Sequence, residues 1–495
     1  MIFALKEMAN YSDLVGSKLW PDLDDSFVET LLNEAAKLAD TSIAPLNQSA
    51  DKAGSILKNG KVSTAPGFKE AYKELVNSSW GTVSGLKDYG GQGLPKTLAV
   101  MIQELWNTSC MSFSLCPMLT QGAIEAISHH GTDAQKNEYL PKLLTGEWSG
   151  TMNLTEPQAG SDVGALKTSA KRNTDGSYSI KGTKIYITFG EHDMAENIIH
   201  LVLARIEGAP EGNNGISLFI VPKYIKNEKS KELEKNDLIC IGLEDKLGIH
   251  ASPTCVMSFG EKSGAKGFLL GEENRGLACM FTMMNNARLN VGMQGVGIAE
   301  RSLQQSFAYS KERKQGRHYD GSSNDSTNII EHPDVLKMIL KMESLTQASR
   351  AICYDNAIAI DLAQNHSDKK IREKYYGLLY ILRIIIIHLA NIANDPAVEL
   401  SPNLSWEVYV LAGQQLIDKA LRNNVSHFIF ASSGSVYGLK EEPNVTEDLE
   451  LVPISVYNKT KMVAERVFLS YLKEMKIHCI RPATVCGISP RMRLD

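Results

Sequence analysis

The sequence predicts a multidomain α+β protein in which helical, β, helical and α/β regions follow one another. Its 495 residues exceed what a single hydrophobic core usually serves. The spacing of apolar residues also changes along the chain near residues 150, 276 and 376. We therefore expect an N-terminal helical domain over 1–149, a middle β-domain over 150–275, a C-terminal helical bundle over 276–376 and an α/β unit over 380–495.

The first region shows apolar residues at helical spacing. The segments that predict helices are DSFVETLLNEAAKLADTSIAPL at 25–46, GFKEAYKELVNSSW at 67–80 and TLAVMIQELW at 97–106. A glycine-rich stretch, YGGQGLP at 89–95, lies between the last two and predicts a loop. This opening third of the chain is therefore expected to be mainly helical.

The second region alternates apolar and polar residues in short β-branched runs. Strands are predicted over 177–188, 198–206, 215–222 and 255–259. Turns are predicted at Asp175-Gly176 and at Asn214-Gly215. After the GEENRG turn, Leu277 to Arg313 and the stretch that follows Pro333 show helical periodicity, so two long helices joined by a surface loop are expected there.

The last region alternates buried strands with helices. Apolar strands are predicted at 381–390 (ILRIIIIHLA), 427–432 (HFIFAS) and 477–485 (IHCIRPATV), with helices at 404–423 and 455–475 between them. This β-α-β-α-β order predicts part of a Rossmann-like, doubly wound α/β sheet.

Composition excludes several classes of protein. A net charge of −5, spread along the chain, leaves no basic face for nucleic acid. The start, MIFALKEMANYSD, is broken by Lys6 and Glu7 and does not predict a signal peptide. The apolar run 378–393 carries Arg383 and His388 and is too short for a membrane span. Eight scattered cysteines indicate reduced thiols, no metal site and a cytoplasmic protein.

Five ordered segments in the first three regions identify a family. They are MNLTEPQAGSDVGALKT (152–168), KIYITFGEHD (184–193), DKLGIHASPTCVM (245–257), GEENRGL (271–277) and MFTMMNNARLNVGMQGVGIAERS (280–302). Over about residues 20–376 the chain resembles the acyl-CoA dehydrogenase family, and within it the large subgroup of methylmercaptopropionyl-CoA dehydrogenases. The resemblance implies FAD between the β-domain and the bundle, an acyl-CoA substrate, α,β-desaturation, an electron-transfer flavoprotein as acceptor, and a homo-oligomer.

The same resemblance assigns roles to individual residues. The residues it places on FAD are Leu154, Thr155, Tyr186, Thr188 and, across a subunit interface, Arg313. Ser161 would contact the thioester and Arg288 the CoA. Glu156 and Asp162 are expected to hold the shape of their loop rather than to take part in chemistry.

The catalytic carboxylate of this family has no counterpart here. In the family it usually lies in a late loop of the bundle, beyond the point where the resemblance stops, so the bundle is expected to be partial. The alternative position, one residue before Arg288, is Ala287. Glu300 lies twelve residues from Arg288 on the same predicted helix, about 18 Å away and too far to serve the same thioester. We therefore expect impaired dehydrogenation.

The last region carries a second set of motifs. ASSGSVYG (431–438) follows a strand, YNKTK (457–461) opens a helix and IRPATVCG (480–487) follows. A Tyr-x-x-x-Lys pair places both side chains on one helix face, where the ammonium lowers the pKa of the phenol for acid–base work. Together the motifs resemble the extended short-chain dehydrogenase/reductase family, the NAD-dependent epimerases and dehydratases, in which Ser433, Tyr457 and Lys461 would be catalytic.

This second unit is also expected to be partial. This family binds NAD at a glycine-rich turn after its first strand, and no such turn precedes Ile384. GMQGVG (292–297) lies within a predicted helix and is interpreted as close helix packing.

Three functions therefore remain open from the sequence. The first is an impaired FAD-dependent acyl-CoA dehydrogenase joined to a reductase fragment. The second is an NAD-dependent nucleotide-sugar epimerase or dehydratase in the last region. The third is a non-catalytic flavin- or acyl-CoA-binding remnant, or the product of joining parts of two genes.

Overall fold

The structure is a computed structural model. It describes residues 1–160, 162–226, 232–319, 325–376, 406, 410–422, 427–432, 434–437, 449–453 and 456–481. The chain divides into two compact units, Met1–Ser367 and Asp368–Asp495. No helix among the residues described has both the length and the apolar character that a membrane crossing requires.

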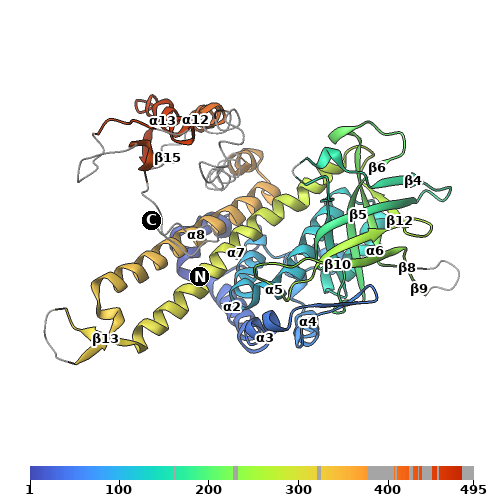
Figure 1. The fold of residues 1–495 in the computed structure, drawn as a ribbon, viewed down its shortest axis with the longest axis horizontal. Coiled ribbons are helices and arrows are strands. Elements are labelled where there is room, and N and C mark those ends of the chain that lie inside the picture. Colours follow the sequence, from blue (N-terminus) through green and yellow to red (C-terminus); the bar gives the residue numbers. More distant parts are fainter. Residues whose placement is uncertain are drawn as a thin grey trace. The chain divides into compact units, whose positions relative to one another are not determined.

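The first unit begins with a helical region (Figure 1). Its elements are η1 (Ala4–Met8), α1 (Tyr11–Gly16), α2 (Asp25–Leu38), η2 (Ala39–Ile43), α3 (Leu46–Ala53), β1 (Ile56–Lys58), β2 (Lys61–Ser63), α4 (Phe68–Asn77), η3 (Trp80–Thr82), η4 (Lys87–Tyr89), α5 (Lys96–His130) and α6 (Asp133–Thr145). The Asp24 side chain caps α2 by accepting from the N–H of Phe27 at 2.7 Å. The mainly helical opening region was thus predicted correctly.

Helix α5 is longer than the predicted 97–106 segment and is buried along most of its length. Its N-terminus is capped from a distant helix, because Asp361 accepts from the backbone N–H groups of Lys96 (2.8 Å) and Thr97 (2.9 Å). The helix kinks at Cys110, which has non-helical dihedral angles. Arg301 donates to the carbonyl oxygens of Thr108 (2.9 Å) and Ser109 (3.2 Å), which the kink leaves without regular helical partners.

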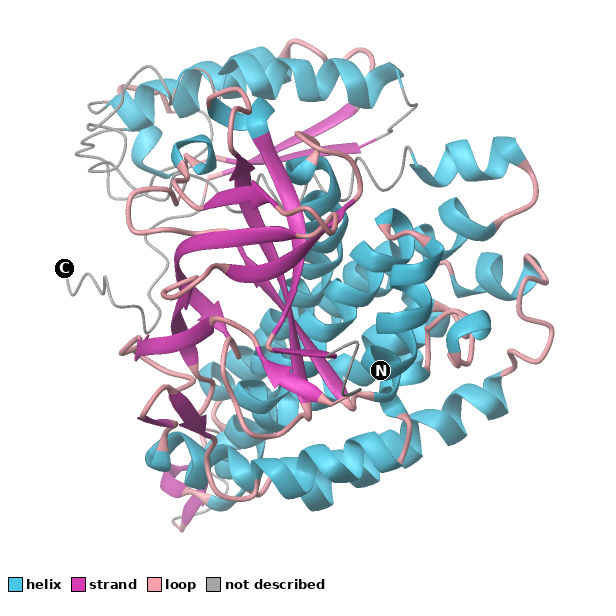
Figure 2. Ribbon diagram, turned by 90° about the vertical axis from the view of Figure 1, so that its right-hand side faces the viewer, coloured by secondary structure: helices cyan, strands magenta, loops and turns pink. Residues whose placement is uncertain are grey.

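The middle region is a closed β-barrel. Its strands are β3 (Trp148–Asn153), β4 (Ser169–Arg172), β5 (Tyr178–Thr188), β6 (Asn197–Ile206), β7 (Ile216–Pro222), β10 (Leu238–Leu243), β11 (Thr254–Phe259) and β12 (Ala265–Leu270), with η5 (Val163–Ala165) and η6 (Gly212–Gly215) in its loops. Strand β5 pairs with β12, β12 with β7, β7 with β6, β6 with β4, and β4 again with β5. The ring therefore closes on itself, and the strands curve accordingly (Figure 2).

Three further strands extend the ring, and its interior is tightly packed. Strand β3 adds in parallel to β6, while β11 and then β10 add antiparallel to the second half of β5. A separate hairpin of β8 (Tyr224–Lys226) and β9 (Leu233–Lys235) follows β7. Every residue of β7 is buried, and apart from Ser217 its sequence is an apolar run rather than an alternation of apolar and polar residues.

Two long helices, α7 (Gly276–Glu312) and α8 (Pro333–Asn365), follow the barrel and pack side by side (Figure 1). Arg350 of α8, 2% exposed, donates to Glu104 of α5 and to Glu300 of α7, each at 2.7 Å, and so ties the three helices together. The connection between α7 and α8, expected as a plain loop, contains β13 (Lys314–Arg317), β14 (Ser326–Asn328) and the turn η7 (Ile329–Glu331).

The glycines of GMQGVG have three different environments. A Cβ on Gly297 would lie 2.9 Å from Asn107 Cβ, so the prediction of close helix packing is confirmed there. A Cβ on Gly292 would make an ordinary contact with Cys353 Sγ at 3.4 Å. Gly295 has no atom within 4 Å of such a Cβ, and the prediction is wrong for it because it lies on the exposed side of α7.

The second unit contains a small α/β core. The described elements are α12 (Ala412–Arg422), β15 (His427–Ala431), η9 (Gly434–Tyr437), α13 (Val456–Leu469) and β16 (Lys476–Ile480). Strands β15 and β16 pair in parallel, and Phe428, Phe430 and Phe468 pack in their shared core. Helix α13 ends at Leu469, six residues earlier than predicted, and the predicted strand at 381–390 lies outside the described residues.

Candidate active site

The loop that follows β3 is held by its backbone against strand β5. The carbonyl oxygen of Leu154 accepts from Lys184 Nζ at 2.9 Å, and that of Thr155 accepts from the N–H of Ile185 at 2.9 Å. Because both carbonyl groups face β5, the path of the loop is fixed by two contacts. The side chains of Leu154 and Thr155 remain half-buried at this end of the strand.

Glu156, the next residue of the loop, is buried and accepts hydrogen bonds from several segments. Its carboxylate accepts from Lys184 Nζ (2.8 Å), from the N–H of Lys167 (2.7 Å) and from the Oγ1 of Thr168 (2.6 Å). Burial alone would raise the pKa of Glu156, but the Lys184 ammonium and the hydrogen bonds outweigh it and lower the pKa to about 2. These contacts support the expectation that Glu156 holds the shape of the loop.

A β-bulge in β5 directs Tyr186 outward. Lys184 pairs with Met257 and Ile187 pairs with Cys255, so Ile185 and Tyr186 together face the one residue between them on β11. The bulge places Tyr186 in the left-handed region, with φ of +61°, and leaves it 59% exposed. This conformation is unfavourable for a bulky residue, so we interpret the bulge as a feature that orients the phenol ring.

Four of the predicted cofactor residues lie at one end of β5. Tyr186 adjoins Ile185, whose N–H binds the Thr155 carbonyl, and Thr188 lies half-buried two residues further along the strand. Leu154 directly precedes Thr155, and its carbonyl oxygen accepts a hydrogen bond from Lys184 Nζ of the same strand. Ser161, predicted to contact the thioester, lies outside the described residues.

The two predicted arginines lie far apart on α7. Arg288 is exposed, donates to Asn285 Oδ1 at 3.1 Å and has its guanidinium carbon 5.9 Å from the centre of the Phe281 ring. Arg313 directly follows the helix and contacts Gln315. Twenty-five residues of helix separate the two arginines, which is about 37 Å. They therefore cannot serve one small-molecule site within a single copy of the chain.

Neither of the positions considered for a catalytic base provides one. Ala287 has no titratable group. The carboxylate of Glu300 is engaged by Arg350 Nη2 at 2.7 Å and by Gln304 Nε2 at 2.7 Å, and these partners lower its pKa despite partial burial. Glu300 is thus part of the network that joins the helices.

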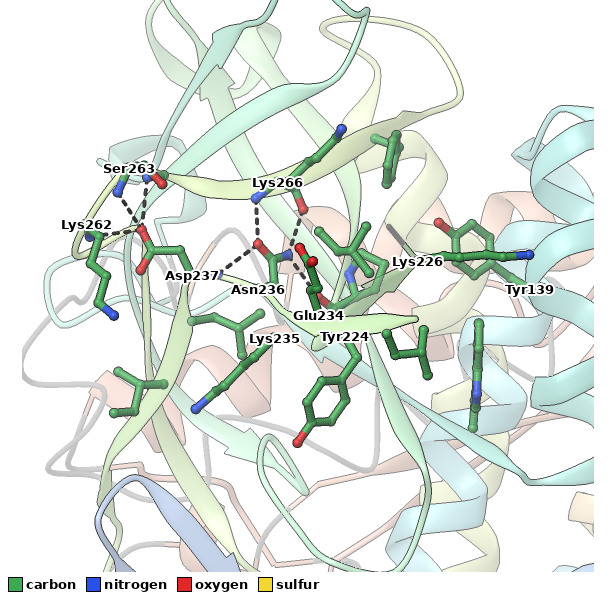
Figure 3. Close-up of a pocket in the computed structure, with 18 of the residues that line it drawn as sticks. Tyr139, Tyr224, Lys226, Glu234, Lys235, Asn236, Asp237, Lys262, Ser263 and Lys266 are labelled. Atoms are coloured by element: carbon green, nitrogen blue, oxygen red, sulfur yellow. Dashed lines mark hydrogen bonds between the residues drawn. The ribbon is translucent and has the colours of Figure 1, made fainter. Parts of the chain in front are cut away.

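A large groove lies elsewhere, on the outside of the barrel (Figure 3). It has a volume of about 1650 Å³ and is lined mainly by β8, β9, β12 and α6, with none of the predicted site residues. Two of its charged groups have structural partners: Lys266 pairs with Asp175 at 2.8 Å, and Asp237 accepts from three consecutive backbone N–H groups at 262–264. These contacts hold neighbouring turns and strands of the barrel together.

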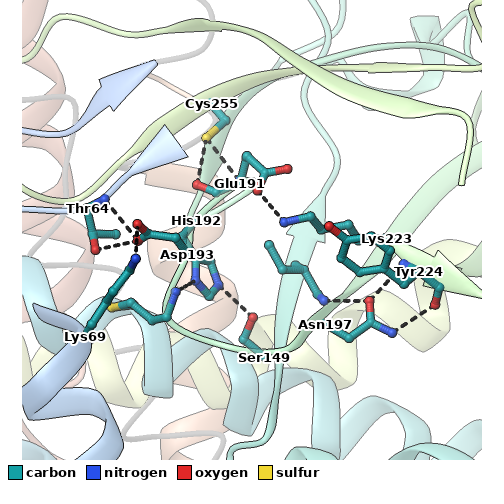
Figure 4. A network of polar contacts seen from close by, with 12 residues as sticks. Thr64, Lys69, Ser149, Glu191, His192, Asp193, Asn197, Lys223, Tyr224 and Cys255 are labelled. Atoms are coloured by element: carbon teal, nitrogen blue, oxygen red, sulfur yellow. Dashed lines mark hydrogen bonds and ion pairs between the residues drawn. The ribbon is translucent and has the colours of Figure 1, made fainter. Parts of the chain in front are cut away.

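The motif GEHD at 190–193 has a structural role (Figure 4). Glu191 forms a buried ion pair with Lys223, and the ring of His192 is bonded to Ser149 at 2.8 Å. Asp193 accepts from Thr64 and pairs with Lys69 at 2.8 Å, which joins the barrel to the N-terminal helices. The motif thus fixes the barrel in place beside the helical region.

Three family models match the first unit in order. They are the acyl-CoA dehydrogenase N-terminal domain over residues 28–147, the middle domain over 151–261 and the C-terminal domain over 274–378. A butyryl-CoA dehydrogenase of Syntrophomonas wolfei is 34% identical over 413 residues, which are 80% of this chain and 67% of that protein. The chain belongs to the acyl-CoA dehydrogenase family.

Other members of the acyl-CoA dehydrogenase family give the same picture. The 3-methylmercaptopropionyl-CoA dehydrogenase of Ruegeria pomeroyi is 46% identical over 365 residues, which are 74% of this chain and 62% of that protein. The chain thus spans about three fifths of that relative. The solved structure of butyryl-CoA dehydrogenase from Megasphaera elsdenii has the same fold, with a TM-score of 0.57 at 22% identity over 80% of this chain and 90% of that one.

FAD is the cofactor of this family of flavoproteins, and the barrel end fits it. A planar ring needs a backbone that is held flat and an aromatic side chain that is free to lie against it. The loop carbonyls turned toward β5 and the exposed, bulge-directed Tyr186 meet both needs. The roles of the individual site residues stay predictions.

The last region matches the NAD dependent epimerase/dehydratase family model over residues 384–493. Of its predicted catalytic residues, Ser433 and the side chain of Tyr457 lie outside the described residues. Lys461 is 2% exposed, with its ammonium 4.9 Å from the centre of the Phe430 ring. Burial lowers the pKa of Lys461 to about 8, and nearby Glu465 opposes that shift.

These residues do not fit NAD. A nicotinamide nucleotide needs an accessible lysine and a glycine-rich turn for its pyrophosphate, whereas Lys461 is covered and the sequence at 376–384 contains a single glycine. Glu465, also buried, is bound by Arg481, whose Nη1 donates to the hydroxyl of Tyr437 at 2.7 Å. The described part of this unit is thus held together by polar contacts on the helix face that carries Lys461.

Sequence reasoning did not assign Lys184 a role. It lies within the motif KIYIT, in which the family resemblance assigned roles only to Tyr186 and Thr188. A signal was available, since a lysine in the middle of a strand whose neighbours face a core needs a buried acidic partner, and Glu156 is the acidic residue of the preceding motif. Arg350, which joins α5, α7 and α8, was also missed.

Proposed function

We propose that the first unit binds FAD and an acyl-CoA thioester but dehydrogenates poorly. The observation that supports this most directly is the end of β5, where Leu154, Thr155, Tyr186 and Thr188 gather while Ala287 and the engaged Glu300 supply no base. On this proposal the division of the chain is the expected one, at 1–149, 150–275, 276–376 and 380–495.

In α,β-desaturation a carboxylate removes the α-proton as hydride leaves the β-carbon. FAD, when bound, accepts that hydride. Leu154, Thr155, Tyr186 and Thr188 would hold the flavin ring, and Ser161 and Arg288 would hold the thioester and the CoA. Each of these groups binds or orients, and none can take the α-proton. Without the base, turnover is expected to fall by roughly 10² to 10⁴.

The test is flavin reduction in the purified full-length chain loaded with FAD. Butyryl-CoA or 3-methylmercaptopropionyl-CoA is added without oxygen while the flavin absorption is followed. We expect a yellow protein whose spectrum shifts when the thioester binds but bleaches at a rate at least a hundredfold below that of an intact family member. The control Arg288→Ala should weaken the spectral shift. Bleaching at a comparable rate would contradict the proposal.

The electron acceptor and the oligomeric state are also proposed from the family resemblance. An electron-transfer flavoprotein would be the acceptor of any electrons that reach FAD. A homo-oligomer is proposed from the family resemblance, in which Arg313 reaches FAD across a subunit interface. Arg313 follows the C-terminal end of α7, 37 residues beyond the start of that helix next to the barrel. Light scattering of the FAD-loaded protein should give a multiple of 54.5 kDa, and a monomer would exclude the role assigned to Arg313.

For the last region we propose no NAD-dependent turnover. The covered Lys461 and the lack of a glycine-rich turn support this. The test is conversion of nucleotide sugars by the purified chain in the presence of NAD. Measurable epimerisation or dehydration would favour the second candidate function over a structural remnant.

A further inference from the structure

Beneath the loop at 154–156 lies a lysine that reaches it from strand β5. Lys184 is completely buried, and its ammonium donates to the Leu154 carbonyl at 2.9 Å and to the Glu156 carboxylate at 2.8 Å. We propose that Lys184 is a positioning residue for FAD, whose buried ammonium fixes the backbone of Leu154 and Thr155 in the orientation that the flavin ring requires. The inference rests on the proposed function in one respect, namely that FAD binds at this end of β5.

The contacts of the pair connect three segments. Lys184 lies in β5, Leu154 and Glu156 lie in the loop after β3, and the Glu156 carboxylate also accepts from the N–H groups of Lys167 and Thr168, just before β4. Both β4 and β5 belong to the closed ring of strands. The ion pair therefore fastens the loop to the rigid part of the barrel, which is the arrangement that keeps a binding group in place.

A neutral side chain could not replace Lys184. The Leu154 carbonyl and the Glu156 carboxylate both need donors, and a buried carboxylate without its cation is strongly unfavourable. An ammonium at the end of a flexible chain can serve both acceptors from one position in the strand. Removing it should free the Leu154 carbonyl and so loosen the segment that carries Leu154 and Thr155.

The barrel contains a second buried pair of the same chemistry. Lys223 and Glu191 are both mostly buried and join the turn at 190–193 to the end of β7, and their hydrogen bonds do not involve the loop at 154–156. Loss of either lysine should cost stability for the same reason. Only the loss of Lys184 should change flavin binding, so Lys223→Met is the matched control.

The experiment compares the wild type with Lys184→Met, Lys223→Met and the double variant Lys184→Met/Glu156→Gln, each as the full chain stripped of flavin. FAD affinity is titrated by quenching of flavin fluorescence, and the bound flavin spectrum and the Tm are recorded. The double variant contains no unpaired buried charge and should recover most of the lost Tm. Its FAD affinity should remain weaker than that of the wild type, roughly tenfold to a hundredfold, because the Leu154 carbonyl still lacks its donor.

The outcomes separate the two proposals. If the wild type fails to bind FAD, the proposed function is wrong, and the inference about Lys184 is wrong with it. If the wild type binds and the double variant binds with the same affinity and spectrum, Lys184 has only a structural role and the proposed function stands. Equal weakening by Lys223→Met would likewise overturn the inference, since the effect would then follow from stability alone.

Discussion

The barrel and the pair of helices that follows it differ in how fully they are enclosed. The ring of strands closes through β4, and its core residues, among them Leu218, Phe219 and Val221, are completely buried. On α7 and α8, by contrast, large apolar side chains remain exposed, among them Ile298 at 45% and Leu345 at 59%. The residues proposed to hold FAD lie mainly on the closed part, whereas Ala287 and Glu300, the two positions weighed for a base, lie on α7 in the open part.

The difference teaches that a cofactor site and a proton-transfer group can depend on parts of a fold that are enclosed to different degrees. A cofactor site built on a closed ring depends on contacts within that ring, and here those contacts are present. A proton-transfer group carried by a bundle depends on helices that must themselves be packed. The helices α7 and α8 bury apolar side chains and are also joined to α5 by an ionic network centred on Arg350.

Replacement of Arg350 should have the largest effect on stability. Arg350→Ala leaves the buried carboxylate of Glu104 without its cation, so the free energy of unfolding should fall by about 3 to 5 kcal/mol. Urea denaturation of the purified chain measures this. The double variant Arg350→Ala/Glu104→Gln should recover part of the loss, because Gln carries no charge. A loss below about 1 kcal/mol would mean that apolar packing alone holds the helices.

Acidification should lower the stability of the chain through two histidines of the barrel and raise it through Asp361 of α8. Burial, with Lys223 nearby, lowers the pKa of His192 and of His200 in the barrel to about 3. Their stabilising contribution is present above pH 6.5 and is lost as the pH falls, because only the unfolded chain takes up protons in that range. The expected loss between pH 7.5 and pH 5 is about 2 kcal/mol for each histidine.

Asp361, which caps α5, has the reverse dependence. Burial raises its pKa to about 6, against hydrogen bonds that lower it, so the folded chain takes up a proton before the unfolded chain does. Its contribution is present below pH 3.8 and is lost as the pH rises through 6. Asp361→Asn should therefore make the loss of stability on acidification larger, by about 1 kcal/mol. An unchanged pH dependence in this variant would show that Asp361 is ionised at both pH values.

Two glycines of α7 should give the smallest effects, with opposite signs. Gly295→Ala should stabilise the chain by up to about 1 kcal/mol, because the position is open and alanine favours a helix. Gly297→Ala should destabilise it, because the new methyl group would lie 3.0 Å from the backbone nitrogen of Thr108. Thermal unfolding of both variants decides this, and stabilisation by Gly297→Ala would show that α5 and α7 can move apart freely.

Most of the regular elements could be predicted because their apolar patterns are strong and local. Strands β5, β6, β7 and β11 and helices α7 and α8 lie where the sequence placed them. Closure of the ring could not be predicted, since β4 and β12 are short and the pairings that close the ring, β4 with β6 and β12 with β5, join segments distant in sequence. The predicted turn at Asn214-Gly215 is the end of the helical turn η6, and most of the N-terminal helical elements before α2 went unpredicted because polar residues interrupt them.

The candidate site was predictable only through its motifs. The family resemblance of the segments at 152–168 and 184–193 assigned both to one site. It could not show that a bulge turns Tyr186 outward, since bulges depend on the register with β11. Nor could it show that the Glu300 carboxylate accepts a hydrogen bond from Arg350, because Arg350 lies fifty residues away on another helix.

The closed ring of strands also limits where the chain can be cut. The hydrogen-bonding edge of β4 is covered only when β5 and β6 are both in place, and the ring is complete only once β12 at 265–270 has been added. An expression fragment that ends between 169 and 270 would carry exposed strand edges and should aggregate. The change from one family to the other after residue 376 lies outside this interval, so two genes could be joined there without opening the barrel.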